Sequence, residues 1–306
     1  MRAQKRKKSP QQPHTVYPGA APGAGRSGQV GTRSAPGRNR TILPSLAVKP
    51  THLPVSSLLS FIHAAHASWM VESPWSERGG ILVTAPPGQL KTTMLYSLER
   101  YNDALCTSDI NIRSMKSVRD MVLGGRYKSM VFGELEKLYA RNPATAQNIE
   151  SHLKQFVEEG LRHFSHEDSA IPIMPARAMV LAGMTPSMFG QHYTGWNENG
   201  FLRRFICIQY ILDNEKAILD AVHRWSKINI TTPVFQSNGS FMLPYNLTKE
   251  ESRWVCDLMG EQQHSTPMVL IKKVAVVLKS QDERTWTKIL FDLSPALGKN
   301  GAKLVL

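Results

Sequence analysis

The sequence has little cysteine: only Cys106, Cys207 and Cys256 occur, far apart and odd in number. That pattern argues against a disulfide framework or a zinc site and favours three buried thiols in a reducing compartment. Long hydrophobic runs are also missing, since arginine and glutamine interrupt the longest one, from Leu202 to Leu212. No run reaches the roughly 18 residues that a transmembrane helix needs, so we expect a cytoplasmic protein without a membrane partner.

Acidic residues are missing from the start of the chain, where none precedes Glu72, while residues 1–50 hold ten lysines and arginines. Those ten leave only +3 of the formal net charge of +13 to the rest of the chain, which is therefore mildly basic. Residues 1–45 are rich in proline, glycine, serine and glutamine, and they cannot bury enough apolar surface to offset the entropy of ordering. We predict a disordered basic tail there, which contacts phosphates, serves as a nuclear address or solubilises the chain.

Residues 46–230 alternate short β-prone runs with segments of helical periodicity, which predicts an α/β domain with a mostly parallel sheet covered on both faces. The expected strands are 81–84, 104–107, 129–132, 178–183 and 205–212. The expected helices are 56–69, 91–100, 117–123, 144–159, 186–192 and 215–227.

Residues 231–306 are predicted to form a second, smaller region, with helices at 248–262 and 267–280 and two short strands within 286–306. The strands would flank Lys299-Asn300-Gly301, with Lys303 just beyond. We interpret this region as a small helical lid or a winged-helix-like module. Lys272, Lys273 and Lys279 would form a basic helix face that either binds DNA or is merely solvated.

A phosphate-binding turn is predicted after the first strand, where the sequence reads Ala85-Pro86-Pro87-Gly88-Gln89-Leu90-Lys91-Thr92. This segment resembles the Walker A motif of P-loop ATPases, in the order strand, turn and helix that the motif requires. The resemblance implies that ATP and Mg²⁺ bind here, with Lys91 and turn N–H groups on the phosphates and the Thr92 hydroxyl on the metal. The nucleotide-contacting set would be Pro87, Gly88, Gln89, Leu90, Lys91, Thr92 and Thr93.

Two positions depart from the motif: Ala85 replaces its first glycine, and Leu90 replaces the glycine before the lysine. The second change matters more, because a leucine side chain disfavours left-handed backbone dihedrals. The alternative interpretation is a strand, turn and helix in which Lys91 occurs by chance.

The strand expected at 129–132 leads into Gly133 and Glu134, and this run resembles a Walker B strand. In that family an aspartate at the position of Gly133 holds magnesium, and a glutamate at the position of Glu134 orients the attacking water. Because Gly133 offers no side chain, Asp109, after the preceding strand, is the candidate magnesium partner beside Thr92. Glu134 could instead be a carboxylate that a helix N-terminus favours.

Two later segments extend the resemblance to AAA+ ATPases. Thr185 ends an apolar strand before Pro186, where the family has its sensor 1 residue, although Thr185 also suits a helix N-cap. Arg204, in the run Gly200-Phe201-Leu202-Arg203-Arg204-Phe205, resembles the arginine that faces the nucleotide of a neighbouring subunit. Arg203 is the alternative, and a pair of surface arginines beside a strand is the simpler interpretation.

The order of these four segments resembles an AAA+ core over residues 55–230, in the manner of helicase-like ATPases of phages and mobile elements. The resemblance implies an oligomeric, ATP-hydrolysing protein in which Glu134, Thr185 and Arg204 are catalytic. Together with the basic tail, it also implies nucleic acid as partner, in replication, recombination or packaging. The alternatives are a nucleotide-dependent switch or scaffold without hydrolysis, a basic DNA-binding protein and, more weakly, a small-molecule kinase.

Histidine occurs ten times, but no pair has convincing metal-ligand spacing. His63 and His66 fall on one helix face, and we expect satisfied or surface side chains there rather than ligands. No Ser–His–Asp constellation is apparent that would compete with the nucleotide site.

Overall fold

The computed structural model of the chain describes residues 52–107, 112–139, 143–161, 175–211, 242–260 and 264–297. The chain divides into two compact units, Met1–Ser45 and Leu46–Leu306, and every described residue belongs to the second. The predicted basic tail and the helix expected at 215–227 therefore lie outside the described residues.

The centre of the fold is a sheet of five parallel strands, as the sequence predicted. The strands are β1 (Gly80–Thr84), β2 (Ala104–Thr107), β3 (Ser129–Phe132), β4 (Met179–Met184) and β5 (Phe205–Gln209). Their order across the sheet is β2-β3-β4-β1-β5, so β4 lies between β1 and β3. The strands β1, β3 and β4 are buried along their whole length, which explains their continuous apolar runs.

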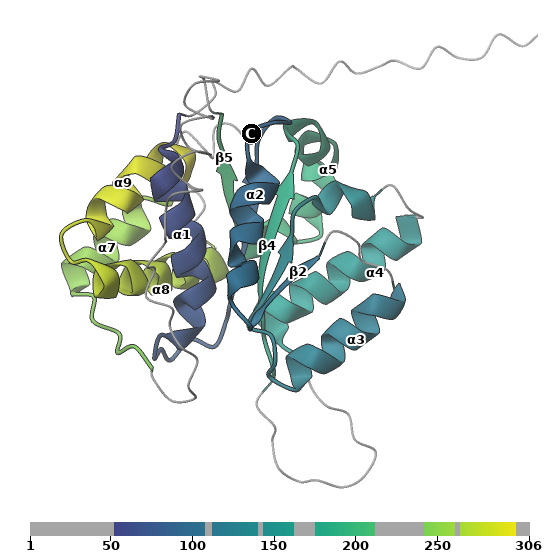
Figure 1. The fold of residues 1–306 in the computed structure, drawn as a ribbon, viewed down its shortest axis with the longest axis horizontal. Coiled ribbons are helices and arrows are strands. Elements are labelled where there is room, and N and C mark those ends of the chain that lie inside the picture. The colour runs from purple at the N-terminus through teal and green to yellow at the C-terminus, as the bar shows by residue number, and fades with distance from the viewer. Residues whose placement is uncertain are drawn as a thin grey trace, which may run out of the picture. The chain divides into compact units, whose positions relative to one another are not determined.

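Helices cover both faces of the sheet (Figure 1). One face carries α1 (Val55–Ala67), α2 (Lys91–Tyr96), α7 (Lys249–Asp257), α8 (Ser265–Gln281) and α9 (Trp286–Leu297). The other carries α3 (Ile112–Leu123), α4 (Pro143–Lys154) and α5 (Pro186–Glu198). Side chains alternate between the two cores with the period of a strand: on β1, Ile81 and Val83 pack on the first face and Leu82 on the second.

Short helical turns join these elements. Four are 3₁₀ turns: η1 (Ser68–Met70), η2 (Ser97–Arg100), η3 (Leu135–Leu138) and η5 (Leu202–Arg204). The fifth, η4 (Gln155–Glu159), is a π-helical turn that ends α4. Such turns often occur at functional positions, and η3 and η4 both contribute charged side chains described below.

The structure of the segment that begins at Trp286 differs from the prediction. It was expected to form two short strands, but residues Trp286–Leu297 form the helix α9. Trp286, Leu290, Leu293 and Leu297 are buried, and their spacing of three to four residues is that of one helix face. The expected wing at Lys299-Asn300-Gly301 lies outside the described residues.

Helix α9 packs on α1 and α8, and α8 packs on α1 and α7, so α7, α8 and α9 share one core with the strands. Within the described residues, no helix is both long enough and apolar enough to cross a membrane.

Candidate functional site

The carboxyl ends of β1, β4 and β3 lie side by side at one edge of the sheet. The register pairs Thr84 with Met184 and Phe132 with Ala182, so the segments that follow these strands emerge together. These segments are the phosphate-binding turn, Thr185 and Gly133-Glu134, and the turn lies at the upper edge in Figure 1. The fold therefore brings together three of the four segments that the sequence singled out.

Lys91 is the first residue of α2, and its side chain folds back onto the turn that precedes it. The Nζ atom donates hydrogen bonds to the carbonyl oxygens of Ala85, at 2.6 Å, and Pro86, at 2.9 Å. Lys91 is buried, with 9% of its surface exposed. Burial lowers the pKa of its ammonium group, while the carboxylates of Glu136 and, to a smaller extent, Glu134 oppose that shift. Lys91 is held by carbonyl groups, and no carboxylate among the described residues pairs with it directly, so it is suited to bind an anion that enters the turn.

The turn contains two residues with left-handed backbone dihedrals, Gly88 and Leu90. Leu90, with φ 59° and ψ 13°, is the only non-glycine residue with positive φ in the described part of the chain. Such a conformation costs a leucine roughly 1–2 kcal/mol, and the side chain offsets part of that cost by packing against the core. The space beside Gly88 is open, since an added Cβ would meet no atom within 4 Å.

Tyr210, just beyond β5, contacts the turn through a hydrogen bond. Its hydroxyl donates a hydrogen bond to the carbonyl oxygen of Gln89, and its ring is buried. Burial raises the pKa of this hydroxyl well above its usual range, so it stays a donor. No sequence signal pointed to Tyr210, because it comes from a strand 121 residues away from Gln89.

Gly133 occupies a position with no room for a side chain. A Cβ atom there would lie 2.8 Å from Cγ2 of Thr92 and 2.9 Å from Cζ of Tyr96. The Thr92 hydroxyl also donates a long hydrogen bond of 3.4 Å to the Gly133 carbonyl. Because α2 packs directly over this point, the aspartate that a Walker B strand would have here does not fit.

Two carboxylates follow β3 at this edge. Glu134 is 42% exposed and forms an ion pair of 2.9 Å with Lys137. Glu136, in η3, accepts hydrogen bonds from the Thr185 backbone N–H, at 3.0 Å, and from the Thr185 hydroxyl, at 2.9 Å. The Walker B resemblance pointed to Glu134 and not to Glu136, although Glu136 follows only two residues farther along the same turn.

Thr185 has the helix-capping role that the sequence left open for its position, while the role of sensor 1 residue stays a prediction. It is the N-cap of α5, with its hydroxyl oxygen accepting from the Met188 N–H at 3.5 Å, and Pro186 starts the helix. The same hydroxyl donates to Glu136 at 2.9 Å, so it also takes part in the polar cluster beside the turn.

A cavity of about 830 Å³ lies next to Glu136 and Thr185, between α4 and α5. On its wall, the buried Glu150 accepts hydrogen bonds from the Tyr139 hydroxyl at 2.6 Å, Trp196 Nε1 at 2.8 Å and Asn199 Nδ2 at 3.3 Å. Three donors compensate this buried carboxylate, so it fixes the cavity wall.

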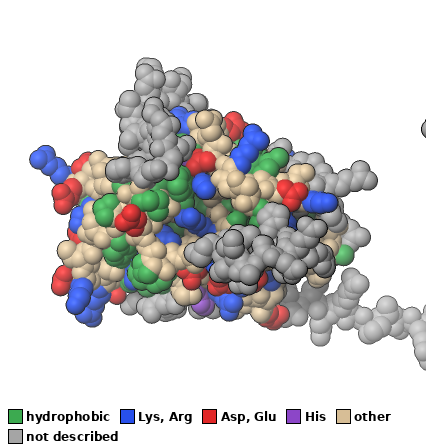
Figure 2. Space-filling model, turned by 90° about the horizontal axis from the view of Figure 1, so that it is seen from below, with side chains coloured by type: hydrophobic (Ala, Val, Ile, Leu, Met, Phe, Trp, Pro, Cys, Tyr) green, Lys and Arg blue, Asp and Glu red, His purple; other side chains and the backbone are tan. Residues whose placement is uncertain are grey.

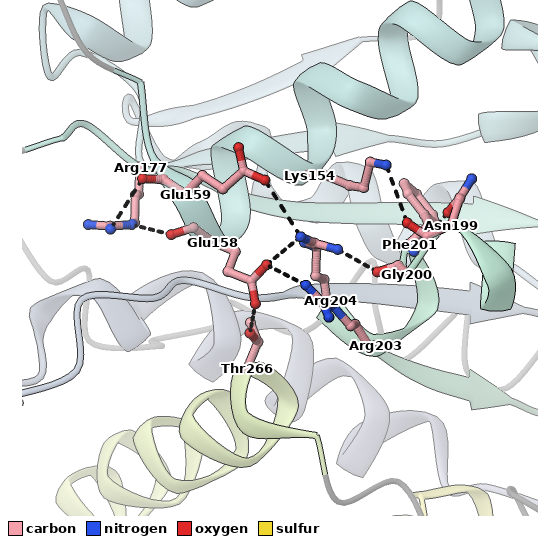
Figure 3. Close-up of polar contacts among 10 residues, drawn as sticks. All are labelled: Lys154, Glu158, Glu159, Arg177, Asn199, Gly200, Phe201, Arg203, Arg204 and Thr266. Atoms are coloured by element: carbon pink, nitrogen blue, oxygen red, sulfur yellow. Dashed lines mark hydrogen bonds and ion pairs between the residues drawn. The ribbon is translucent and has the colours of Figure 1, made fainter.

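Arg204 lies at the opposite end of the strands from the turn, immediately before β5 begins (Figure 3). Only 7% of its side chain is exposed, and its Nη2 atom lies 2.5 Å from Oε2 of Glu158. Thr266, at the start of α8, donates to the other oxygen of the same carboxylate at 3.1 Å. Arg203 is 54% exposed and lies 3.7 Å from Glu158. The chain does not bring Arg204 to its own phosphate-binding turn, and its action on a neighbouring subunit stays a prediction.

The predicted metal ligands can be placed only in part. Thr92 lies in the turn as described, whereas Asp109 lies outside the described residues. Nowhere in the described ranges do three histidine, cysteine, aspartate or glutamate side chains gather as a metal site. Magnesium on a nucleotide usually takes few protein ligands beside the phosphates, and the Thr92 hydroxyl with the carboxylates that follow β3 fits that pattern.

One constellation that the sequence did not reveal is a buried Ser–His–Asp chain. His66 Nδ1 lies 2.8 Å from the Ser129 hydroxyl, and His66 Nε2 lies 3.2 Å from Asp103 Oδ1. Ser129 is fully buried at the start of β3 and His66 is 3% exposed, so no substrate reaches them. These three linked side chains connect α1 to the sheet, and their role is structural.

Comparison with protein-family models, with curated proteins and with solved structures finds no significant match to the chain. The parallel α/β fold is thus shown by the structure, and the AAA+ resemblance rests on the sequence segments themselves.

Proposed function

We propose that the chain is an ATP-binding protein of the AAA+ type that hydrolyses ATP and acts on nucleic acid. The observation that carries the proposal is the burial and the hydrogen bonding of the Lys91 side chain. Its buried ammonium group is held over the turn by the carbonyl groups of Ala85 and Pro86, 2.6 and 2.9 Å away. Phosphate oxygens are stronger partners for a lysine than neutral carbonyl groups, because both partners are then charged.

In the proposed complex the phosphates lie in the turn against Lys91 and the backbone N–H groups of residues 88–93. Thr92 offers its hydroxyl to the magnesium ion that accompanies the nucleotide. Magnesium supplies charge neutralisation at the β- and γ-phosphates when bound. The open space beside Gly88 leaves room for the ligand to approach the backbone closely.

The strand order supports an ATPase rather than a chance turn. Because β4 lies between β1 and β3, Thr185 emerges between the turn and the two glutamates. Glu134, which is 42% exposed, is free to rotate toward a water molecule once its pair with Lys137 opens. Glu136 holds Thr185 in place through two hydrogen bonds. In this arrangement Glu134 orients water, and Glu136 is a positioning residue.

The role of Arg204 in a neighbouring subunit belongs to the same proposal and requires a homo-oligomer. Support for a nucleic-acid partner comes from the basic N-terminal tail and from the resemblance to helicase-like ATPases.

A nucleotide-dependent switch that does not hydrolyse ATP is the second candidate, and Gly133 favours it. The packing of Thr92 and Tyr96 leaves no room for an aspartate there, so one magnesium-supporting carboxylate is lost. The two candidates share the binding site and differ only in turnover.

The test is ATP binding and phosphate release by the full chain, with and without single-stranded and duplex DNA. Lys91→Ala is expected to weaken ATP binding at least tenfold, about 1.4 kcal/mol, since it removes the one buried cation of the turn. The matched control is Lys288→Ala, because that lysine is 73% exposed on α9 and forms only a surface pair with Asp292. Equal ATP affinity in both variants would refute the site.

Turnover distinguishes the two candidates. Hydrolysis that is lost in Glu134→Gln, while binding is kept, would support the ATPase, since only the water-orienting carboxylate is neutralised. Binding without any phosphate release by the wild-type chain would establish the switch instead.

A further inference from the structure

The edge of the sheet opposite the phosphate-binding turn holds two adjoining pockets that share the ring of Trp75. The first, of about 510 Å³, also contains Trp69, and the second, of about 460 Å³, contains Tyr245. We call the two pockets together the basic–aromatic strip. Nothing in the proposed nucleotide site uses them, because they lie where the strands begin rather than where they end.

Three cations line the first pocket: Arg78, Arg177 and Lys273. Lys273 Nζ donates to the carbonyl oxygens of Trp75, at 2.7 Å, and Glu77, at 2.9 Å, and Arg177 Nε donates to that of Glu158 at 2.7 Å. Neutral carbonyl groups thus accept hydrogen bonds from these two side chains and orient them.

Arg78 has an unusual environment. Its Nε atom is buried and has no hydrogen-bond partner among the described residues. Burial, with the charge of Arg177 as a lesser cause, lowers the pKa of Arg78 to about 10. Burial and then the charge of Arg78 lower the pKa of Lys273 to about 8. Crowded cations of this kind reduce stability unless an anion joins them, which is typical of binding sites.

The second pocket is lined by three further cations, Lys249, Arg253 and Lys272, and its described lining contains no acidic residue. In the first pocket Glu72 is the one acidic residue of the described lining. Six cations therefore face one carboxylate along the strip. Figure 2 views this end of the molecule from below and shows blue side chains among green and tan ones near its middle.

Aromatic rings alternate with these cations. The Trp75 ring meets the Tyr245 ring edge to face, with centroids 5.8 Å apart, and Lys272 Nζ lies 5.4 Å from the Trp75 centroid. Beside the first pocket, Lys128 Nζ lies 5.4 Å from the centroid of the Trp69 ring. Trp69, Trp75 and Tyr245 are each half-buried, so their rings are fixed and yet keep exposed surface.

We propose that the basic–aromatic strip binds single-stranded nucleic acid, with phosphates on the cations and unpaired bases on the tryptophans. Single-strand binding uses this combination of a positive groove and aromatic platforms, because every base has a face that stacks. Each pocket has a volume suited to one nucleotide, and the shared Trp75 makes the track continuous from one pocket to the next. A duplex hides its base faces and cannot use the rings. The inference deepens the nucleic-acid part of the proposed function and is independent of the phosphate-binding turn.

The test measures binding of the full chain to a fluorescent oligothymidylate by anisotropy, over a series of salt concentrations. Arg78→Gln is expected to weaken binding and to make the salt dependence shallower by about one phosphate contact. Trp75→Leu is expected to weaken it at least about fivefold through lost stacking. Arg253→Gln, on the exposed surface, repeats the charge test without disturbing the core. The control is Lys288→Gln on α9, which should bind as wild type.

A footprint on Cys256 gives a second readout, because this thiol lines the second pocket. Burial raises the pKa of Cys106 and of Cys207 to about 12, so a maleimide should modify Cys256 first. The oligothymidylate is expected to slow that reaction.

Three results would overturn the proposal: equal affinity of wild type, Arg78→Gln, Arg253→Gln and Trp75→Leu, tighter binding of duplex than of single strands, or binding of mononucleotides but not of the oligonucleotide. If wild type and these three variants bind the oligonucleotide with equal affinity, binding is assigned to the basic tail. Lys91→Ala is expected to keep its affinity for the oligonucleotide, so failure of the nucleotide site and failure of the strip are distinguishable.

Discussion

Gly133→Ala tests the packing that removes the Walker B carboxylate. The added Cβ would lie 2.8 Å from Thr92 Cγ2 and 2.9 Å from Tyr96 Cζ, closer than real Cβ contacts allow. The Tyr96 ring can swing away, since it is the far end of a flexible side chain, whereas the short Thr92 side chain moves only with α2. The substitution therefore perturbs the hydroxyl that is proposed to meet magnesium.

The expected cost is that of overpacking a well-packed site, about 1–3 kcal/mol. In a chain of this size that corresponds to a fall in Tm of roughly 3–10 °C. Displacing Thr92 should also weaken Mg-ATP more than ATP alone. Tyr96→Leu removes the clashing ring atoms, so the double variant Gly133→Ala, Tyr96→Leu should recover part of the loss of stability.

Thermal and urea unfolding, with Mg-ATP titrations, measure these effects. The matched control is Gly190→Ala in α5, where an added Cβ meets nothing within 4 Å. Alanine in a helix is preferred over glycine, so this control should gain about 0.5–1 kcal/mol. If Gly133→Ala is as stable as wild type and binds Mg-ATP equally well, the position has room for a side chain and the steric explanation is wrong.

Two further predictions concern buried side chains that can ionise. Burial, helped by the charge of Arg100, lowers the pKa of His63 to about 3, so acidification from pH 6.5 protonates the unfolded chain only. Stability should fall by up to about 1.4 kcal/mol per pH unit, and His63→Gln should show a smaller loss in urea unfolding between pH 7.5 and 5; identical slopes would contradict this. Arg204→Met should lower the free energy of unfolding by roughly 2–3 kcal/mol, because Glu158 loses its close partner yet stays partly exposed. Arg203→Met, at an exposed position, should cost under about 1 kcal/mol, and equal costs would refute the assigned pairing.

The sequence predicted the strands well because each is a short, mostly apolar run, and the sheet buries β1, β3 and β4 along their whole length. β2 and β3 fall on the expected residues, and the other three differ by one to three residues at their ends. The strand, turn and helix around residues 85–92 were likewise recognisable, since they are consecutive in the chain, and phosphate binding by that turn stays a prediction. Its left-handed residue at Leu90 appears where the motif normally has glycine.

Among the described residues, the element predicted wrongly is 286–297, and it shows how local signals mislead. A polar Lys-Asn-Gly turn suggested a hairpin, while Trp286, Leu290, Leu293 and Leu297 already had helical spacing. Packing against α1 and α8 favours the helix, because a helix buries these apolar side chains together on one face.

By itself, the sequence determined the parallel α/β fold and the strand, turn and helix at which phosphate binding is predicted, since periodicity and motif are local properties of the chain. Only the tertiary structure decided which polar groups surround that turn. Tyr210, just beyond β5, donates to the turn, Glu136 in η3 binds the neighbouring Thr185, and Gly133 is required by the packing of α2. The basic–aromatic strip likewise combines side chains about two hundred residues apart, such as Trp69 and Lys273. Such long-range contacts depend on how strands are ordered across the sheet, and no local spacing encodes that order.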